Sequence, residues 1–224
     1  LKFHDELWKI ISELYPEDVI NRIDKFVVFS DNNKNNRNGM SGLIESVDGT
    51  NNSRFILSID IADAYYGNKI SLEVFLNLLV HEFFHLVSLN DTQISPNYTK
   101  GVKIYEGYTY ESSYINKFYE KFWNNSLGKR LEMLELNSKL SFAQKETIRE
   151  ELYKYNQDKF VDTYAMTNMV EDIAVSFEDF IRLNKGYLGD SLKDKKIDFF
   201  YSYADLVKYK NHFIQKKKEM IRKY

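Results

Sequence analysis

The chain contains no cysteine, so disulfide bonds and a metal site built from thiolates are both excluded. It has no apolar run of the roughly 18 residues that a membrane-spanning helix needs. Its formal net charge is only −2, which argues against a general nucleic-acid-binding protein. Hydrophobic residues nevertheless make up 43% of the chain and aromatic residues 16%, which is enough to build a core. We therefore expect an ordered globular protein with no transmembrane segment and no nucleic-acid partner.

The chain also lacks internal repeats and any linker rich in proline or glycine. A length of 224 residues suits one large domain or two small ones, and the lack of a linker favours one. We expect a single domain over residues 1–224 and a monomer. Residues 1–90 would hold the first helices, a small sheet and a chemically distinctive helix, and residues 91–224 would be mainly helical. No signal peptide is recognisable and the chain opens in an amphipathic helix, so a processed N-terminus is expected.

The spacing of apolar residues predicts an α+β fold. Leucine and isoleucine recur at helical spacing over residues 5–15, and Pro16 can open a second helix that reaches Ile23. Short β-prone segments at 26–29, 41–47 and 53–61 predict a small, mostly antiparallel, hairpin-connected sheet, with a polar loop at 30–39. A long apolar segment, 74–87, predicts a buried helix that Ser71 can cap. Further helices are expected around 115–122 and 131–134, and over 142–160, 168–183 and 203–224.

Two of the four histidines, His81 and His85, lie in this buried helix as the pentapeptide HEFFH, an instance of the HExxH motif. Histidines four residues apart project from one helix face and can bind one zinc ion, and the carboxylate of Glu82 between them can polarise a metal-bound water. The alternative is a helix that happens to carry two histidines. Burying two imidazoles and a carboxylate among apolar neighbours is costly unless something compensates them, and a metal does so directly. The pattern therefore favours a zinc site.

The third ligand of such a site has several candidates. A catalytic zinc ion usually takes three protein ligands, and HExxH supplies two. Glu171 is the first candidate, but with Asn168 it also has the spacing of a helix N-cap pair, so the residues alone leave ligand and cap open. Glu178 shares the face of Glu171 and is a further candidate. Asp91 occupies the last ligand position of the compact HExxHxxGxxH pattern, although Ser88 stands where that pattern needs glycine.

Two segments resemble signatures of a group of bacterial zinc metallopeptidases with a zincin fold. Residues 79–90, LVHEFFHLVSLN, resemble their active-site helix, and residues 164–174, YAMTN followed by EDIA, resemble their second signature. The resemblance covers roughly residues 26–185 and implies a zincin-like sheet packed on the HExxH helix, with Zn²⁺ held by His81, His85 and Glu171 in the manner of glutamate zincins. Two departures put the helix packing and the surroundings of the ligands in doubt: Phe84 replaces a frequent glycine, and Val175 replaces a frequent glutamate.

This resemblance implies a function, namely zinc-dependent hydrolysis of peptide bonds by an endopeptidase. The zinc would activate a water molecule, and Glu82 would act as the general base. The protein or peptide substrate would lie extended along a sheet edge offered by residues 41–47 or 55–60. Members of this group are expected to be exported, often as lipoproteins, so we expect a secreted or surface-anchored bacterial protein.

Supporting roles are assigned to residues near the two motifs. Tyr164 is the first candidate for the hydrogen-bond donor to the oxyanion, with Tyr105, Tyr108 and Tyr110 as alternatives and ordinary packing as the other explanation. Asp172 could accept a hydrogen bond from one of the ligand histidines, or could simply be exposed.

Two other hypotheses remain open from the sequence. The protein could be a non-catalytic zinc-binding surface interaction protein that retains the zincin fold, or a helical scaffold without metal. The presence of Glu82 favours a peptidase over the non-catalytic zinc-binding protein, because a protein without turnover has no need of a general base.

Overall fold

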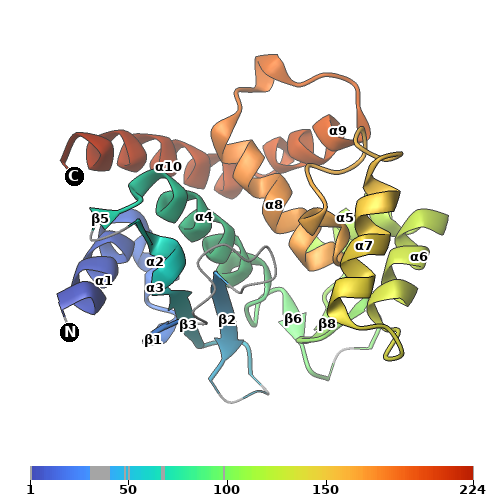
Figure 1. Ribbon diagram of the computed structural model, residues 1–224, viewed down its shortest axis with the longest axis horizontal. Coiled ribbons are helices and arrows are strands. Elements are labelled where there is room, and N and C mark those ends of the chain that lie inside the picture. The colour runs from blue at the N-terminus through green and yellow to red at the C-terminus, as the bar shows by residue number, and fades with distance from the viewer. Residues whose placement is uncertain are drawn as a thin grey trace.

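The computed structural model describes residues 2–30, 41–47, 49, 51–66, 69–97 and 99–223, and over these residues the fold is α+β (Figure 1). Helices pack on one side of a small three-stranded sheet, and an α+β fold is what the apolar patterns predicted. The polar loop expected at 30–39 lies outside the described residues from position 31 onwards. In the described part of the chain, every helix is too short or too polar to cross a membrane.

The main sheet consists of β1 (Ile23–Phe29), β3 (Phe55–Asp60) and β2 (Gly42–Ser46), in that spatial order. β2 and β3 form the expected antiparallel hairpin, but β1 runs parallel to β3, so this sheet is mixed rather than mostly antiparallel. Phe55, Leu57 and Ile59 of β3 are buried, whereas the apolar side chains of β2 are only partly buried. The most buried strand therefore takes the centre, where both of its edges can pair, and β2 is left at an edge.

Two smaller antiparallel ladders complete the strands. One joins β4 (Tyr65–Tyr66) to β5 (Lys69–Ile70), after the short helix α3 (Ile61–Ala64). The other places β8 (Gly107–Thr109) between β6 (Ile94–Ser95) and β7 (Lys103–Ile104). These strands were not predicted, because two or three residues are too few to show an alternating pattern.

The N-terminal helices pack against the end of the chain. The buried leucines and isoleucines of α1 (Lys2–Leu14) have the predicted helical spacing. α2 (Glu17–Ile20) is a single turn after Pro16, and Ile23 begins β1 rather than ending this helix. The last helix, α10 (Ala204–Lys223), contacts α1, so both ends of the described chain lie on the same side of the molecule (Figure 1).

The HExxH motif lies in α4 (Leu72–Ser88), which is the predicted helix extended at both ends. All its residues from Leu79 onwards are buried. Ser71 stands at the N-cap position, but its side chain accepts no hydrogen bond there, so the predicted capping role is wrong. α4 lies between β2 of the main sheet and α8 (Met169–Arg182), and contacts both (Figure 1).

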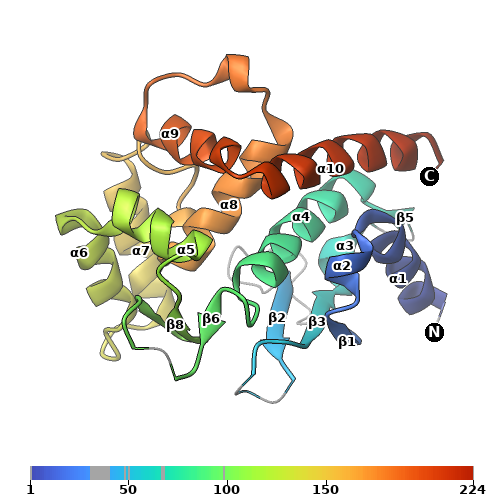
Figure 2. The same cartoon turned by 180° about the vertical axis from the view of Figure 1, so that it is seen from behind.

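The second half of the chain is mainly helical, as expected. It contains α5 (Tyr114–Phe118) with a π-helical continuation (Tyr119–Trp123), α6 (Ser126–Glu135), α7 (Phe142–Tyr153), α8, α9 (Leu192–Phe199), α10 and short 3₁₀ turns at Tyr164–Met166, Lys185–Tyr187 and Phe200–Ser202. The sequence did not predict α9. The chain that leaves α4 runs into β6, beside the helices α5, α6 and α7 (Figure 2).

The predicted helix over 142–160 is too long. α7 ends at Tyr153, and the side-chain amide of Asn156 donates to the carbonyl of Leu152. The hydroxyl of Tyr153 donates to the carbonyl of Val161. These side-chain hydrogen bonds satisfy backbone groups that further helix would otherwise use.

Aromatic rings fill the space between α4, α8 and α10. Phe84 stacks on Phe177 with ring centroids 4.4 Å apart, and Phe83 meets Phe213 edge-on at 4.7 Å. Such pairs add to the free energy gained from burying the rings. Phe84 thus sets the separation of α4 and α8 with a pair of stacked rings, which fixes where a side chain on α8 meets the histidines of α4.

Candidate metal centre

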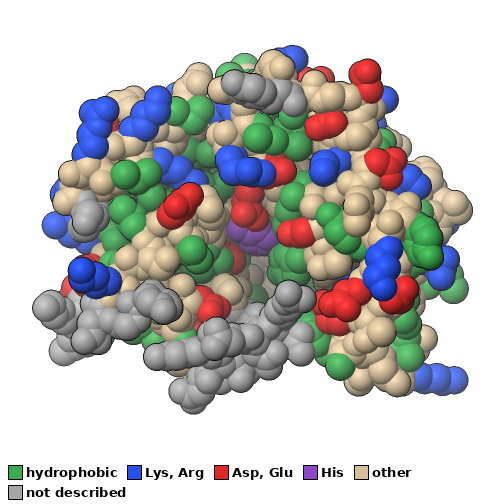
Figure 3. Space-filling view, turned by 45° about the horizontal axis from the view of Figure 1, so that its top comes forward, with side chains coloured by type: hydrophobic (Ala, Val, Ile, Leu, Met, Phe, Trp, Pro, Cys, Tyr) green, Lys and Arg blue, Asp and Glu red, His purple; other side chains and the backbone are tan. Residues whose placement is uncertain are grey.

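The two histidines of the HExxH motif lie on the side of α4 that faces α8. Residues four apart are about one helical turn apart, so their side chains stack on one face. The Nε2 atoms of His81 and His85 are 3.0 Å apart, and each residue is only 7% exposed. In Figure 3, histidine atoms are visible at the bottom of a hollow in the surface, with acidic side chains near them.

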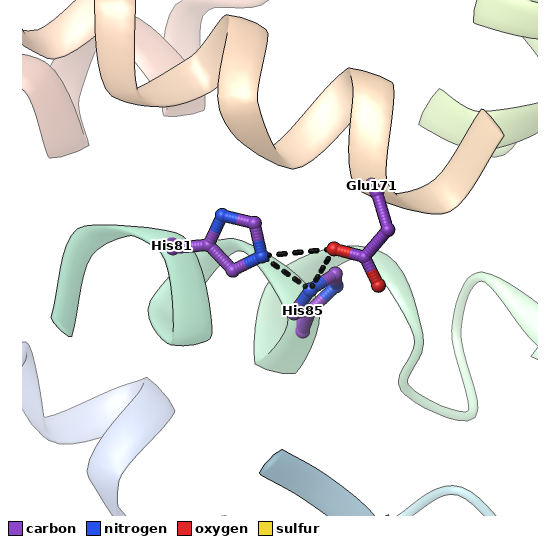
Figure 4. A group of neighbouring side chains, drawn as sticks. All are labelled: His81, His85 and Glu171. Carbon is purple, nitrogen blue, oxygen red and sulfur yellow. Dashed lines mark hydrogen bonds and ion pairs between the residues drawn. The ribbon is translucent and has the colours of Figure 1, made fainter. Parts of the chain in front are cut away.

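Glu171 reaches the same point from the first turn of α8 (Figure 4). Its Oε2 atom lies 3.0 Å from Nε2 of His81 and 3.5 Å from Nε2 of His85. Asn168 caps α8 by accepting from the backbone N–H groups of Val170 and Glu171. The amide of Asn168 therefore caps the helix by itself, and the carboxylate of Glu171 is turned toward the histidines.

His81, His85 and Glu171 form a group that could hold a metal ion, because one ligand atom from each lies within 4.8 Å of the other two. In the absence of a metal ion, one proton can be shared by two of these three ligand atoms but not by all of them. A cation at their centre would be attracted by all three at once. The donors, two imidazole nitrogens and one carboxylate oxygen, are common metal ligands.

Glu178 lies two turns after Glu171 on α8 and contacts the side of the His81 ring that is turned away from the other ligands. Its Oε1 atom is 2.8 Å from Nδ1 of His81, the ring nitrogen that does not face Glu171. Metal-binding histidines usually donate their second N–H to a carboxylate or carbonyl, which fixes the ring orientation and the tautomer. Glu178, considered above as a ligand, is thus placed as the partner that orients His81.

Asp172 does not orient a histidine and is not exposed, so both expectations for it are wrong. It is fully buried and faces away from the metal site. Its Oδ2 atom accepts from Nζ of Lys196 at 2.6 Å and from Nε1 of Trp123 at 2.6 Å. A rotation of about 100° per residue along the helix separates Asp172 from Glu171 and points it at α9.

Asp91 is also outside the site. Its carboxylate lies 2.8 Å from Nη1 of Arg22, in an exposed ion pair. α4 ends at Ser88, and Asn90 forms hydrogen bonds to the carbonyls of Leu86 and Val87 that close the helix end. The chain therefore does not make the sharp turn back that would bring Asp91 to His81.

The charges of the site reinforce one another. Burial opposes the charged form of His81, but its hydrogen bonds to Glu171 and Glu178 outweigh this and raise the pKa of His81 well above the usual value. Burial likewise works to raise the pKa of Glu171, but the charge of His85 and the hydrogen bonds from both histidines lower this pKa well below the usual value. Without a metal, a proton on His81 therefore supplies the positive charge that this group of ligands requires.

Glu82 lies between the histidines and the edge strand β2. Burial raises the pKa of its carboxyl, and the charges of His81 and His85 offset this only in part. A side chain on Gly42 of β2 would overlap with the carboxylate of Glu82, so any other residue there would displace this carboxylate from its present position. The Oε2 atom of Glu82 is buried and has no hydrogen-bond partner among the described residues.

Tyr164 borders the group of ligands. Its ring centroid is 5.9 Å from that of His81, and about half of its surface, 51%, is exposed. Burial of the rest, followed by the charge of Glu171, raises the pKa of Tyr164, so the hydroxyl keeps its proton and can act as a donor. Tyr105, one of the alternatives, is fully exposed at a hairpin turn.

Two residues near the site were not identified from the sequence. Gly42 could have been noticed, because a glycine inside a predicted strand often marks the close approach of another group. Glu106, in the turn between β7 and β8, is electrostatically coupled to His85 and Glu171. Nothing in its local sequence distinguishes Glu106 from the other acidic residues of the chain.

No family model, no curated protein and no solved structure matches this chain. The functional assignment therefore depends on the geometry of the site.

Proposed function

We propose that this protein is a zinc-dependent peptidase with a zincin-like fold. In this proposal, Nε2 of His81, Nε2 of His85 and Oε2 of Glu171 hold Zn²⁺, and Glu82 is the general base. The observation that carries the proposal is the convergence of these three ligand atoms directly beside a buried glutamate and an edge strand.

The distances between the ligand atoms support zinc. Zinc takes nitrogen and oxygen ligands at about 2.0–2.1 Å, and tetrahedral angles then separate the ligand atoms by about 3.3 Å. The three separations here are 3.0, 3.0 and 3.5 Å. A zinc ion therefore fits with small movements of the side chains. Three protein ligands also leave one position open, as catalytic zinc sites do.

Glu82 has the properties of a general base for hydrolysis. Zinc, when bound, supplies the Lewis acidity that activates water at neutral pH. Burial raises the pKa of Glu82 toward neutral pH, so its carboxylate can accept a proton from water and then deliver it to the leaving amine. Its unpartnered, buried Oε2 atom is available for this exchange.

The edge strand β2 supports a peptide as the substrate. The carbonyl of Ser41 accepts from the N–H of Asp60, and the N–H of Val47 donates to the carbonyl of Arg54, just before β3. In an antiparallel ladder with this register, the backbone groups of Gly42 and Ile44 point away from β3. An extended peptide could pair with these groups and pass beside Glu82. β3, the other edge considered from the sequence, is central and has no edge to offer.

Tyr164 is the proposed donor to the oxyanion. Its hydroxyl keeps its proton and lies against the group of ligands. A donor in this position would stabilise negative charge as it develops on the carbonyl oxygen of the substrate.

The test compares the zinc-loaded wild type with Glu82→Gln on an unfolded protein substrate, with cleavage followed by mass spectrometry. Loss of a general acid–base group lowers turnover by about 10²–10⁴-fold. Glu82→Gln should therefore bind zinc normally and lose almost all cleavage. Glu73→Gln is a matched control, because Glu73 is exposed on the first turn of the same helix. A chelator should abolish cleavage by the wild type and by the control.

Two outcomes would contradict the proposal. Equal cleavage by wild type and Glu82→Gln would show that the activity comes from elsewhere. Zinc binding by the wild type without any cleavage would favour the alternative, a non-catalytic zinc-binding interaction protein.

A further inference from the structure

The two ligand histidines are supported unequally. Both face the proposed metal through Nε2, so Nδ1 of each must carry a proton when the metal is bound. Nδ1 of His81 meets Glu178 at 2.8 Å. Nδ1 of His85 is buried and has no hydrogen-bond partner among the described residues. Leaving a buried donor without an acceptor is unfavourable, so an acceptor for His85 is expected.

Glu106 offers a buried acceptor atom that lacks a donor. Its Oε2 atom is buried and also has no partner within the described residues. Burial raises the pKa of its carboxyl, and the charges of His85 and Glu171 also act on this pKa, so Glu106 lies in the same part of the molecule as the two ligands. The neighbouring Tyr105 in the same turn is fully exposed, which shows that this turn directs one side chain outward and the other inward.

Two hydrogen bonds and a close backbone approach at Gly107 hold the turn that carries Glu106. The side-chain amide of Asn52 donates to the carbonyl of Glu106 at 3.1 Å, and Asn52 itself is buried. The carbonyl of Asn52 accepts from the backbone N–H of Asp91, just beyond the end of α4. Gly107 follows with φ of 139°, and a side chain there would press against the backbone of Ser95. Glu106 is therefore fixed relative to the helix that carries His85.

We propose that Glu106 is the positioning residue for His85, accepting the Nδ1–H of this ligand in the metal-loaded protein as Glu178 does for His81. This inference rests on the proposed zinc site but not on peptidase activity. It gives each ligand histidine its own carboxylate, one from α8 and one from the β7–β8 turn. The turn would then contribute to metal affinity although it contains no ligand.

The test measures zinc affinity by competition with a chromophoric chelator, together with the visible spectrum of the Co²⁺-substituted protein. Loss of a carboxylate that orients a ligand histidine typically lowers metal affinity by about 10–100-fold. Glu106→Ala should show this loss and an altered Co²⁺ spectrum. Glu106→Gln keeps an acceptor oxygen of the same reach, and it should restore most of the affinity and the wild-type spectrum.

Two control variants isolate the effect. Glu111→Ala removes an exposed acid a few residues further along the same segment, and it should leave the zinc affinity unchanged. Ser88→Ala removes a buried hydroxyl on α4 that also lacks a partner in the described chain, and it should leave the affinity unchanged. A loss of affinity in Ser88→Ala but not in Glu106→Ala would assign the acceptor to Ser88 and overturn the inference.

Other outcomes separate this inference from the proposed function. If Glu106→Ala retains wild-type zinc affinity and the wild-type Co²⁺ spectrum, the inference is wrong, even if peptide cleavage changes. A higher KM with unchanged zinc affinity would place Glu106 on the substrate instead. If the wild type binds zinc, and Glu106→Ala binds it more weakly, but neither cleaves peptides, the inference stands and the peptidase proposal fails.

Discussion

Glu171 and Asp172 are consecutive carboxylates on the first turn of α8, and their surroundings differ in one decisive way. Asp172 is fully buried and meets a cation from the chain itself, Lys196, at 2.6 Å, together with the indole N–H of Trp123. Glu171 meets two imidazoles, with two more carboxylates, Glu82 and Glu178, around the same histidines. The first group is a closed ion pair, and the second lacks a permanent cation.

The comparison shows what a buried acid needs. Removing a carboxylate from water costs several kcal/mol unless a cation and hydrogen bonds replace the water. Lys196 and Trp123 meet this need at Oδ2 of Asp172 with groups of the chain itself, which fixes α8 against α9. At Glu171 the need is met by a proton on His81 or by a metal, so this end of the same helix is able to bind and release a cation.

The strongest way to break the metal centre is to remove Glu171. A four-ligand zinc site is worth about 10–16 kcal/mol, so each ligand contributes about 2.5–4 kcal/mol, and Glu171→Ala should weaken zinc binding roughly 60–700-fold. Chelator competition measures this, with circular dichroism to show that the helices remain. Zinc affinity within tenfold of the wild type would exclude Glu171 as a ligand.

Removing Lys196 should break the closed ion pair instead. Lys196→Met leaves Asp172 buried without a cation, and breaking a buried pair in this way costs about 3 kcal/mol or more. Urea unfolding of the metal-free protein measures the loss. The double variant Lys196→Met/Asp172→Asn should recover part of it, because the uncompensated charge is gone. A loss below about 1 kcal/mol in the single variant would show that water reaches Asp172.

Glu178 allows a finer test of the metal centre. Glu178→Ala removes the acceptor of Nδ1 of His81 and should lower zinc affinity by about 10–100-fold, whereas Glu178→Gln should have a smaller effect. The free energy of unfolding should change less than in Lys196→Met, because the side chain of Glu178 is partly exposed. Equal zinc affinities for Glu178→Ala and the wild type would mean that His81 is oriented by packing alone.

The smallest expected effect, counted per pH unit, is the pH dependence of zinc affinity at the metal centre. The raised pKa of His81 means that its proton persists to a higher pH than usual and competes with zinc for Nε2. Zinc affinity should therefore fall as the pH decreases through this raised value, by up to about tenfold per pH unit. Isothermal titration in buffers of different ionisation enthalpy should detect the released proton. A zinc affinity independent of pH between 6 and 8, about the range in which histidine titrates, would contradict a protonated His81 in the metal-free protein.

Local sequence patterns predicted several parts of the structure. The apolar run around His81 and His85 predicted their helix, and helical spacing places both rings on one face whatever surrounds them. The hairpin of β2 and β3 followed from alternation and turn residues. The parallel pairing of β1 was not predicted, because which strand takes the centre depends on burial from both faces of the sheet.

The partners of the histidines were harder to predict. Glu171 was named as one candidate among several, and the orienting role was given to Asp172 rather than Glu178. One helical position rotates a side chain by about 100°, so the choice between neighbouring acids depends on how α8 lies against α4. The stacked rings of Phe84 and Phe177 set that arrangement, and the sequence does not show which aromatic residues meet.

The sequence by itself determined that two imidazoles and a carboxylate would share one turn of a buried helix. The positions of side chains within one helical turn depend only on the local backbone geometry. Only the tertiary structure decided which acids surround them: Glu171 and Glu178 from α8, Glu106 from a hairpin turn, and Lys196 held apart from them by its pairing with Asp172. The physical reason is that a metal site needs donors from separate elements at distances of a few ångströms, and those distances are set by side-chain packing across the whole core.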